Sequence, residues 1–275
     1  MATKLEKAQA FHALHERDGA FVIPNPWDVG SARLFEALGF EALATTSSGF
    51  AYSLGRKDGQ VSRDEKLAHC RALCEATSLP VSADLEKCFA DDPAEAAETI
   101  ALAAEAGLVG GSIEDATGNP DKPIYDFNHA VERVAAAVQV ANSLDIPFVL
   151  TARAENFLHG RRDMDDTIRR LQAFESAGAD VLYAPGPATL DEVREITSAV
   201  TRPVNMLATP LKGVTIAELA EAGVTRISIG GAMMRAVIGT LVQGSRQMLD
   251  EGRFDWMEDM MPTSEINTLF SKWES

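Results

Sequence analysis

The sequence predicts a TIM (β/α)8 barrel that occupies residues 1–275 as a single domain. Eight short apolar segments alternate with eight segments at helical spacing, and the apolar segments are rarely interrupted by polar residues. Continuous apolar strands of this kind are expected where helices cover both faces of a parallel sheet. A length of 275 residues also suits one barrel of this class. A doubly wound open sheet is the structural alternative, but no G-x-G-x-x-G follows the first expected strand.

A helix is expected before the barrel, over 3–17, because Leu5, Ala8, Phe11 and Leu14 recur at helical spacing. The expected strands are 21–24, 42–46, 81–85, 110–113, 148–152, 181–183, 204–207 and 226–229. The expected barrel helices are 31–38, 63–76, 93–106, 126–142, 163–177, 189–199, 215–222 and 232–249. Residues 50–62 are expected to form a long loop.

Local signals support the helix ends. Pro93 stands in the first turn of one expected helix, and glycine follows the last turn of several others. An Ala-Gly pair recurs just before an expected strand, at 106–107, 177–178 and 222–223. Each Ala-Gly pair therefore indicates the end of a helix, after which the chain enters the next strand of the barrel.

The C-terminal segment 254–275 is apolar: it holds Phe254, Trp256, Met257, Met260, Met261, Ile266, Leu269, Phe270 and Trp273. Exposed on a monomer, these side chains would form a larger apolar patch than soluble proteins usually carry. The segment is therefore expected to pack on its own barrel or on a neighbouring subunit. We expect a homo-oligomer, most simply a dimer of dimers.

Composition excludes several classes of partner. The chain has 41 acidic and 25 basic residues, a net charge of −16. Nucleic acids and anionic membranes both favour a basic face, so neither is an expected partner. No apolar run is long enough to span a membrane, and the charged N-terminus lacks a signal-peptide core. Three cysteines in no recognisable pattern favour a reduced, cytoplasmic protein.

Acidic residues end two consecutive expected strands. Asp84 and Glu86 follow the third strand, and Glu114 and Asp115 follow the fourth. In a barrel of this class the active site lies at the carboxyl ends of the strands. Clustered carboxylates repel one another unless protons or a cation neutralise them, and oxygen ligands suit Mg²⁺ or Mn²⁺. The alternative is that these acids are solvated loop residues or helix N-caps.

Other strand ends carry residues that suit an anionic substrate. Arg153 follows the fifth strand and could bind a carboxylate in bidentate fashion, or bridge Glu155 or Asp84 structurally. Residues 47–49, Ser-Ser-Gly, offer backbone N–H groups and hydroxyls to an oxyanion, or form an ordinary turn. Metal, arginine and oxyanion donors together suit a small 2-keto carboxylate and its enolate. Trp27, Asp28 and Asn205 also stand at strand ends and are candidate substrate-binding residues.

Six motifs in this order resemble those of the isocitrate lyase/phosphoenolpyruvate mutase superfamily. They are N-P-W-D-V-G-S-A-R at 25–33, T-T-S-S-G at 45–49, G-R-K-D-G-Q at 55–60, S-A-D-L-E at 82–86, I-E-D-A-T-G at 113–118 and T-A-R-A-E at 151–155. The resemblance implies a (β/α)8 barrel, Mg²⁺, and cleavage or formation of a C–C or P–C bond beside a 2-keto acid or its enolate. It also implies a homotetramer whose last barrel helix is exchanged between paired subunits.

The resemblance also implies residue roles. Asp84 would be the direct metal ligand, and Glu86 and Glu114 would hold metal-bound waters. Arg153 would bind the substrate carboxylate, with Ser47, Ser48 and Gly49 on its oxygens. Asp58, with Ser47 and Arg153 one of the three catalytic candidates, matches an acid that closes over the site.

The loop at 117–123 departs from the better-known members. It reads T-G-N-P-D-K-P and contains neither the K-[KR]-C-G-H motif of isocitrate and methylisocitrate lyases nor the Lys-x-Asn of phosphonomutases. The pattern resembles short-loop members, which include oxaloacetate decarboxylases and uncharacterised proteins. We therefore expect a Mg²⁺-dependent carbon–carbon lyase acting through an enolate on a small carboxylate, of the decarboxylase or methylisocitrate/dimethylmalate lyase kind. P–C bond chemistry on phosphonopyruvate and a catalytically inactive barrel that binds a keto acid are the alternatives.

Overall fold

The computed structural model describes residues 2–273 and confirms the barrel. Eight parallel strands are hydrogen-bonded in the order β1-β8-β7-β6-β5-β4-β3-β2. At the seam, the Ala44 amide donates to the Pro24 carbonyl at 3.0 Å, so the barrel is nearly closed. The strands are β1 (Phe21–Ile23), β2 (Leu43–Ala44), β3 (Val81–Asp84), β4 (Gly110–Glu114), β5 (Val149–Arg153), β6 (Val181–Tyr183), β7 (Val204–Leu207) and β8 (Arg226–Ser228).

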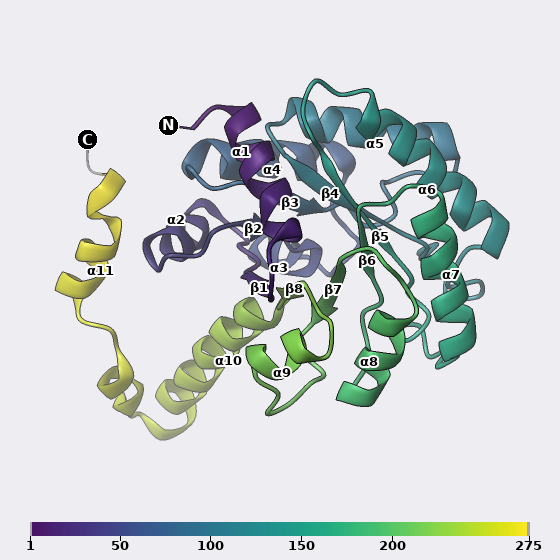
Figure 1. Ribbon diagram of the computed structural model, residues 1–275. Helices are drawn as coiled ribbons and strands as arrows, with labels where there is room; N and C mark the ends of the chain where they lie inside the picture. The colour runs from purple at the N-terminus through teal and green to yellow at the C-terminus, as the bar shows by residue number, and fades with distance from the viewer. Residues whose placement is uncertain (1, 274–275) are drawn as a thin grey trace.

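A helix follows each strand and packs outside the barrel (Figure 1). N-cap side chains fix several helix starts: Ser62, Asp92 and Thr189 each accept a hydrogen bond from a backbone N–H of the first turn. Pro93 stands in the first turn of α5, as the sequence predicts. The helices are α2 (Val29–Ala37), α4 (Arg63–Ala76), α5 (Pro93–Glu105), α6 (Phe127–Asn142), α7 (Met164–Ser176), α8 (Leu190–Ser198), α9 (Ile216–Glu221) and α10 (Ala232–Arg246).

The N-terminal helix α1 (Lys4–Glu16) covers the amino ends of the strands (Figure 1). Its buried face, Ala8, Phe11 and Leu14, packs with side chains from the first residues of several strands, including Val149 and Val181. Removing this apolar surface from water stabilises the barrel and closes that end of it. The opposite, carboxyl end stays free for a site.

One predicted segment is wrong. Residues 47–53 form a helix, α3 (Ser47–Ser53), where the sequence indicated a turn followed by a long loop. Thr46 is its N-cap, and the Thr46 hydroxyl accepts from the Gly49 amide at 3.2 Å. Serine and glycine were read as turn residues, although a threonine just before them is also a common helix start.

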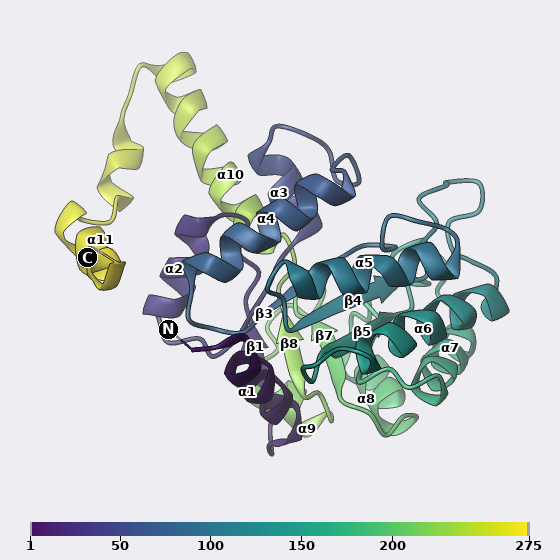
Figure 2. The same cartoon turned by 90° about the horizontal axis from the view of Figure 1, so that it is seen from above.

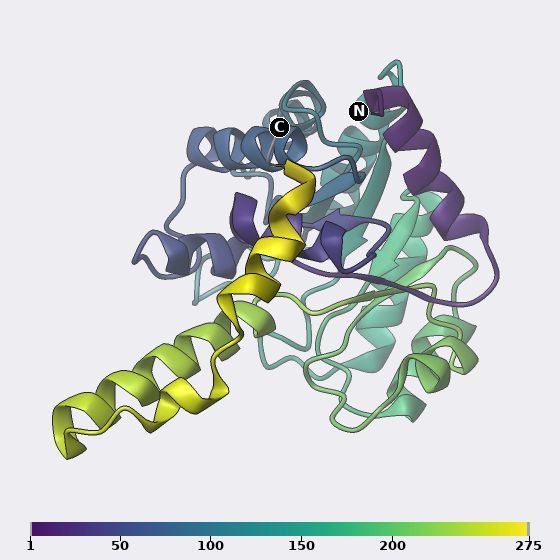
Figure 3. The same ribbon diagram turned by 90° about the vertical axis from the view of Figure 1, so that its left-hand side faces the viewer.

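The C-terminal part leaves the barrel (Figures 2 and 3). Helix α10 projects outward and ends in a π-helical turn, η1 (Gln247–Glu251), and the chain then turns back through η2 (Asp255–Asp259), α11 (Thr263–Phe270) and η3 (Ser271–Trp273). α11 lies beside α2, and the Arg33 guanidinium is 5.4 Å from the Trp273 ring centroid. Part of the tail thus packs on its own barrel, as one alternative expected. Residues 274–275 of the predicted tail lie outside the described residues.

Much apolar surface on this part stays exposed, including Leu241 at 68% and Leu249 at 84% of their accessible area. Helix exchange and the oligomeric state remain expectations for a single chain. Within residues 2–273, no helix has both the length and the apolar character needed to cross a membrane.

Candidate active site

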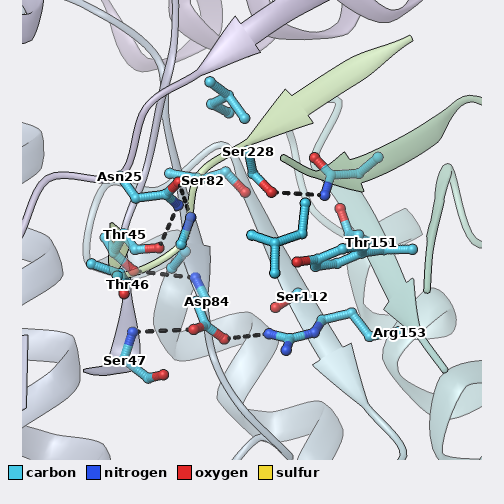
Figure 4. A pocket seen from close by; sticks show the side chains of 18 of the residues that line it. Asn25, Thr45, Thr46, Ser47, Ser82, Asp84, Ser112, Thr151, Arg153 and Ser228 are labelled. Carbon is cyan, nitrogen blue, oxygen red and sulfur yellow. Dashed lines mark hydrogen bonds and ion pairs between the residues drawn. The ribbon is translucent and has the colours of Figure 1, made fainter. Parts of the chain in front are cut away.

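A cavity of about 170 Å³ runs into the barrel from the carboxyl ends of the strands (Figure 4). Six of the predicted site residues line it: Ser47, Ser48, Asp58, Asp84, Arg153 and Asn205. The other five predicted residues are not among its lining residues: Trp27, Asp28, Gly49, Glu86 and Glu114. Strand ends and the start and following segment of α3 thus bring six of the eleven residues to one cavity.

Arg153 is the centre of the site. Its guanidinium pairs with Asp84 at 2.7 Å, Glu114 at 3.1 Å and Glu155 at 2.9 Å. It also lies over the Tyr183 ring, 5.1 Å from the centroid. The bridging role that the sequence left open is therefore present. One guanidinium faces three carboxylates, so the cluster carries excess negative charge when all are ionised.

Asp84 joins the Arg153 cluster to the start of α3. The Ser47 amide donates to Asp84 Oδ2 at 3.1 Å, and Arg153 holds Oδ1 (Figure 4). Burial disfavours ionisation of Asp84, but the charges of Arg153 and Lys66 and the Ser47 hydrogen bonds outweigh it and lower its pKa. Asp84 is therefore an ionised carboxylate at neutral pH. In this structure the Asp84 carboxylate accepts the hydrogen bond of the Ser47 amide, which was predicted to donate to a substrate oxygen.

The neighbouring acids are much less readily ionised. Burial, reinforced by the negative charge of Asp84, raises the pKa of Glu86 to about 7. Burial raises the pKa of Glu114 well above its ordinary value, and Arg153 offsets this only in part. Asp58 stands on the exposed segment after α3, where burial of its carboxylate and the charge of Asp84 raise its pKa. In all three acids burial is the largest cause of the raised pKa, and the negative charge of Asp84 adds to it.

Lys66 belongs to this electrostatic site and was missed from the sequence. It points inward from α4, is 1% exposed, and its ammonium has no hydrogen-bond partner among residues 2–273. Its charge lowers the pKa of Asp58, Asp84 and Glu86. A signal was available, since Lys66 shares the buried helix face of Cys70 and Leu73 at spacings of four and seven.

Three predicted residues have local structural roles. Asp28 is the exposed N-cap of α2, and its carboxylate accepts from the Ser31 amide at 2.7 Å. The Trp27 carbonyl contacts His69 Nε2 at 2.9 Å. At Gly49, an added Cβ would lie 2.4 Å from the Thr46 side chain, so any larger residue would force α3 to shift. None of these three residues lines the cavity.

Asp115 has a structural partner. Its carboxylate pairs with Arg170 at 2.9 Å and accepts from the Glu155 amide at 2.8 Å. Asp115 is 3% exposed and does not line the cavity. Of the two acids that end the fourth strand, only Glu114 therefore faces Arg153.

The donor chemistry fits a hard divalent cation. Asp84, Glu86 and Glu114 offer oxygen only. Asp84 is ionised because its pKa is lowered, and burial, with the charge of Asp84 added, raises the pKa of Glu86 and Glu114, so a cation would favour their ionised forms. Within residues 2–273, no three His, Cys, Asp or Glu side chains converge closely enough to ligate one ion together. The residues therefore fit one direct carboxylate ligand with water completing the shell, a pattern that Mg²⁺ commonly adopts.

An eight-stranded barrel with an arginine and several acids at the carboxyl end of its strands is typical of enzymes that act on small anions. Residues 11–249 match the family model for phosphoenolpyruvate phosphomutase, and the chain belongs to this family, part of the phosphoenolpyruvate mutase/isocitrate lyase superfamily. Characterised members of this superfamily are lyases and mutases.

The chain is 35% identical over 243 residues to an uncharacterised protein of Mycobacterium tuberculosis H37Rv, covering 88% of this chain and 89% of that one. It is 30% identical to 2-methylisocitrate lyase of Escherichia coli K12, over 71% of this chain and 68% of that one. Other relatives are oxaloacetate decarboxylase of Paraburkholderia xenovorans and 2,3-dimethylmalate lyase of Eubacterium barkeri. A crystal structure from Burkholderia cenocepacia J2315, of a protein provisionally classed as a lyase/mutase, is 54% identical with a TM-score of 0.94, covering 98% and 96% of the two chains.

Proposed function

We propose that this protein is a Mg²⁺-dependent lyase that cleaves a carbon–carbon bond of a small 2-keto or 2-hydroxy carboxylate. The observation that carries the proposal is the cluster of Asp84, Arg153 and Ser47 at one cavity mouth. It combines an ionised acid, a buried cation and hydroxyl and amide donors. Named relatives that cleave such bonds, 2-methylisocitrate lyase and oxaloacetate decarboxylase, support the same class.

Each residue has a proposed task. Asp84 holds the cation directly, with Glu86 and Glu114 acting through water. Bound Mg²⁺ would supply positive charge to the oxygens of the substrate and of the enolate that bond cleavage leaves. Arg153 is freed from part of its carboxylate network when a substrate carboxylate binds, and it orients that carboxylate.

The serine and acid at the mouth complete the proposal. Ser47 and Ser48 present hydroxyls to substrate oxygens from the first turn of α3. Asp58 stands on an exposed segment at the cavity, and burial of its carboxylate raises its pKa, the direction that favours a group able to give or take a proton. With a 2-keto substrate that loses CO₂, the electron pair stays on the keto fragment as its enolate, and a proton delivered to that carbon ends the cycle. With a 2-hydroxy substrate, a base takes the hydroxyl proton as the keto fragment forms, and the electron pair and the final proton go to the carbon of the other fragment.

P–C bond chemistry is the second candidate, because the family model that matches is that of phosphoenolpyruvate phosphomutase. The 117–123 loop counts against it. This loop is held to itself, with the Thr117 amide bonded to the Pro123 carbonyl at 2.9 Å, and none of its residues lines the cavity. A third candidate is a barrel that binds keto acids without turnover.

One panel of assays separates these candidates. Oxaloacetate, 2-methylisocitrate, 2,3-dimethylmalate and phosphonopyruvate are incubated with the full-length protein in Mg²⁺ or in EDTA, and products are followed by NMR. The lyase proposal predicts Mg²⁺-dependent release of a keto acid from at least one carbon substrate. Phosphate release from phosphonopyruvate alone would favour the second candidate. Tight Mg²⁺-dependent oxalate binding with no turnover would favour the third.

A further inference from the structure

The interior of this barrel is unusually polar. Barrels of this class are usually filled by layers of branched apolar side chains. Here the cavity wall below Arg153 includes Ser82, Ser112, Thr151, Asn205, Arg226 and Ser228. Buried polar side chains are the informative departures from a normal core. The cavity is therefore built to hold something polar along the barrel axis.

Arg226 is the charged residue at the inner part of this cavity. It is 5% exposed and projects from β8. Its Nε donates to Asn205 Oδ1 and its Nη2 to Thr151 Oγ1, both at 2.8 Å, and its Nη1 lies 3.3 Å from His15 Nε2. Every one of these partners is neutral, since burial and the charge of Arg226 lower the pKa of His15 to about 3.

The guanidinium therefore has no counter-charge in residues 2–273. No carboxylate forms an ion pair with it there, whereas Arg153 holds three and Arg170 two. Burial lowers the pKa of Arg226 to about 10, which leaves it charged at neutral pH. A buried charge without a partner is costly, so buried charges are normally paired.

A second, independent feature faces the same space. Ser112 is 7% exposed, lines the cavity, and its hydroxyl has no hydrogen-bond partner in the described residues (Figure 4). Ser112 pairs in register with Thr151, the residue that Arg226 binds. A hydroxyl without a hydrogen-bond partner and a guanidinium without an ion-pair partner thus border one cavity in the described residues, and a single anion could accept from both.

We propose that Arg226, with Ser112 and Thr151, forms a second anionic subsite that takes the distal carboxylate of a short dicarboxylate substrate. The inference rests on the proposed function, which places the reacting carboxylate at Arg153. Thr151 lies two residues before Arg153 on β5, a separation along the strand of about 6–7 Å. This spacing suits the two ends of a short dicarboxylate and selects against a monocarboxylate of the same length.

The test compares two ligands that differ only at the distal end. L-Malate and L-2-hydroxybutyrate share a carboxylate and a hydroxyl, and a methyl group replaces the second carboxylate in 2-hydroxybutyrate. Affinities are measured by calorimetry in Mg²⁺, with oxalate as a probe of the outer site alone. Wild type is expected to bind malate about tenfold or more tightly than 2-hydroxybutyrate, the range for a charge-assisted hydrogen bond.

Arg226→Gln is expected to abolish that preference by lowering the affinity for malate. The affinities for oxalate and 2-hydroxybutyrate should change by less than about twofold. Arg226→Lys keeps the charge and should keep part of the preference. Arg202→Gln, at an exposed position, is the matched control and should behave as wild type. Ser112→Ala removes only the unpaired hydroxyl and should lower malate affinity alone, which preserves the test if Arg226→Gln fails to fold.

The outcomes separate the two proposals. Failure of wild type to bind oxalate with Mg²⁺ would overturn the proposed function. Normal oxalate binding without a malate preference in wild type would overturn the subsite alone. A malate preference that survives both Arg226→Gln and Ser112→Ala would also overturn it.

Discussion

Asp84 is the residue on which the proposed metal site depends most. Asp84→Ala is expected to abolish Mg²⁺-dependent oxalate binding while the barrel still folds, because Arg153 keeps its pairs with Glu114 and Glu155. Calorimetry with oxalate and Mg²⁺ measures the loss, and circular dichroism checks the fold. Asp191→Ala, at an acid whose side chain is 94% exposed, is the control. Intact metal-dependent binding in Asp84→Ala would refute the assignment.

Glu114 should matter less than Asp84. A residue that acts through water keeps a hydrogen-bonding oxygen after Glu114→Gln, so the affinity for Mg²⁺ should fall by less than in Asp84→Ala. The same titration of oxalate with Mg²⁺ measures both variants. Equal losses in the two variants would mean that Glu114 is also a direct ligand.

Removing the charge of Lys66 should increase the affinity for a divalent cation, whereas the changes at Asp84 and Glu114 should decrease it. Its ammonium adds positive charge beside Asp84 and Glu86, which opposes binding of another cation. Lys66→Met should therefore raise the affinity for Mn²⁺, followed by electron paramagnetic resonance, several-fold. It should also not destabilise the protein, since it removes a buried ammonium that has no partner in the described chain. A weaker Mn²⁺ affinity in Lys66→Met would show that the lysine supports the site in another way.

At the scale of elements, the strands were predictable and two inward basic side chains were missed. All eight strands lie where apolar runs bounded by glycine, proline or polar residues indicated them. The positions of Asp84 and Arg153 at the rim could then be predicted, because parallel strands end at one edge of the barrel. Lys66 could have been found from its helical spacing to Cys70 and Leu73, but an isolated lysine in a helix usually faces solvent. Arg226 has no comparable signal, and three-dimensional packing shows that it points inward.

The loop between β3 and α5 is strained, and Arg133 makes more side-chain hydrogen bonds to its backbone than Thr99 or His129 does. Glu86, Cys88 and Phe89 all have φ between 53° and 59°, a region that non-glycine residues rarely adopt. Arg133 of α6 donates to the carbonyls of Lys87, Ala90 and Asp91 at 2.5, 2.6 and 2.8 Å. These bonds fix the backbone that carries Glu86, because the strain needs compensation.

Arg133→Met should therefore lower stability by about 3 kcal/mol, since three partly buried hydrogen bonds to backbone carbonyls are lost. It should also weaken Mg²⁺-dependent oxalate binding at a temperature where the variant is folded. Chemical denaturation and calorimetry measure the two effects. Arg169→Met, at a residue with a 66% exposed side chain, is the matched control. An Arg133→Met protein as stable as this control would show that the loop holds its shape without the arginine.

Helix α1 makes stability depend on pH through His15. Burial and the charge of Arg226 lower the pKa of His15 to about 3, from an ordinary value near 6.5. Because the pKa of His15 is lower in the folded state, the unfolded chain takes up a proton here that the folded protein does not. The free energy of unfolding is therefore unaffected by His15 above about pH 6.5 and falls as the pH drops toward 3. Between pH 7 and 5 the loss should be about 2 kcal/mol.

Urea denaturation at several pH values tests this expectation. His15→Gln cannot gain a proton and should flatten the pH dependence by that amount, while His12→Gln, on the exposed face of α1, should not. Equal slopes in wild type and His15→Gln would refute the prediction. His69, whose pKa burial lowers to about 4, adds a similar dependence that both variants retain.

At the scale of the whole molecule, the outward helix α10 and the tail define the expected assembly. Leu241 and Leu249 are among the most exposed large apolar side chains, and burying such area contributes roughly 25 cal/mol per Å². We expect a homo-oligomer at micromolar concentration. A truncation before Phe254 should lower both the number of subunits in the assembly and the solubility of the protein. Light scattering and sedimentation measure the mass, and a full-length monomer would contradict the expectation. Leu249→Glu tests the same surface in the complete chain.

Helix α1 closes the amino end of the barrel, so the cavity has one entrance for ligands. With α1 packed there, ligands enter and leave by the carboxyl rim, past Asp58 and Ser47. A cleaved substrate must then depart in order, the fragment at the rim first and the fragment near Arg226 last. The last fragment to leave occupies the path of the next substrate, so it should inhibit competitively. The first should inhibit in a non-competitive pattern, and steady-state product inhibition would distinguish the two.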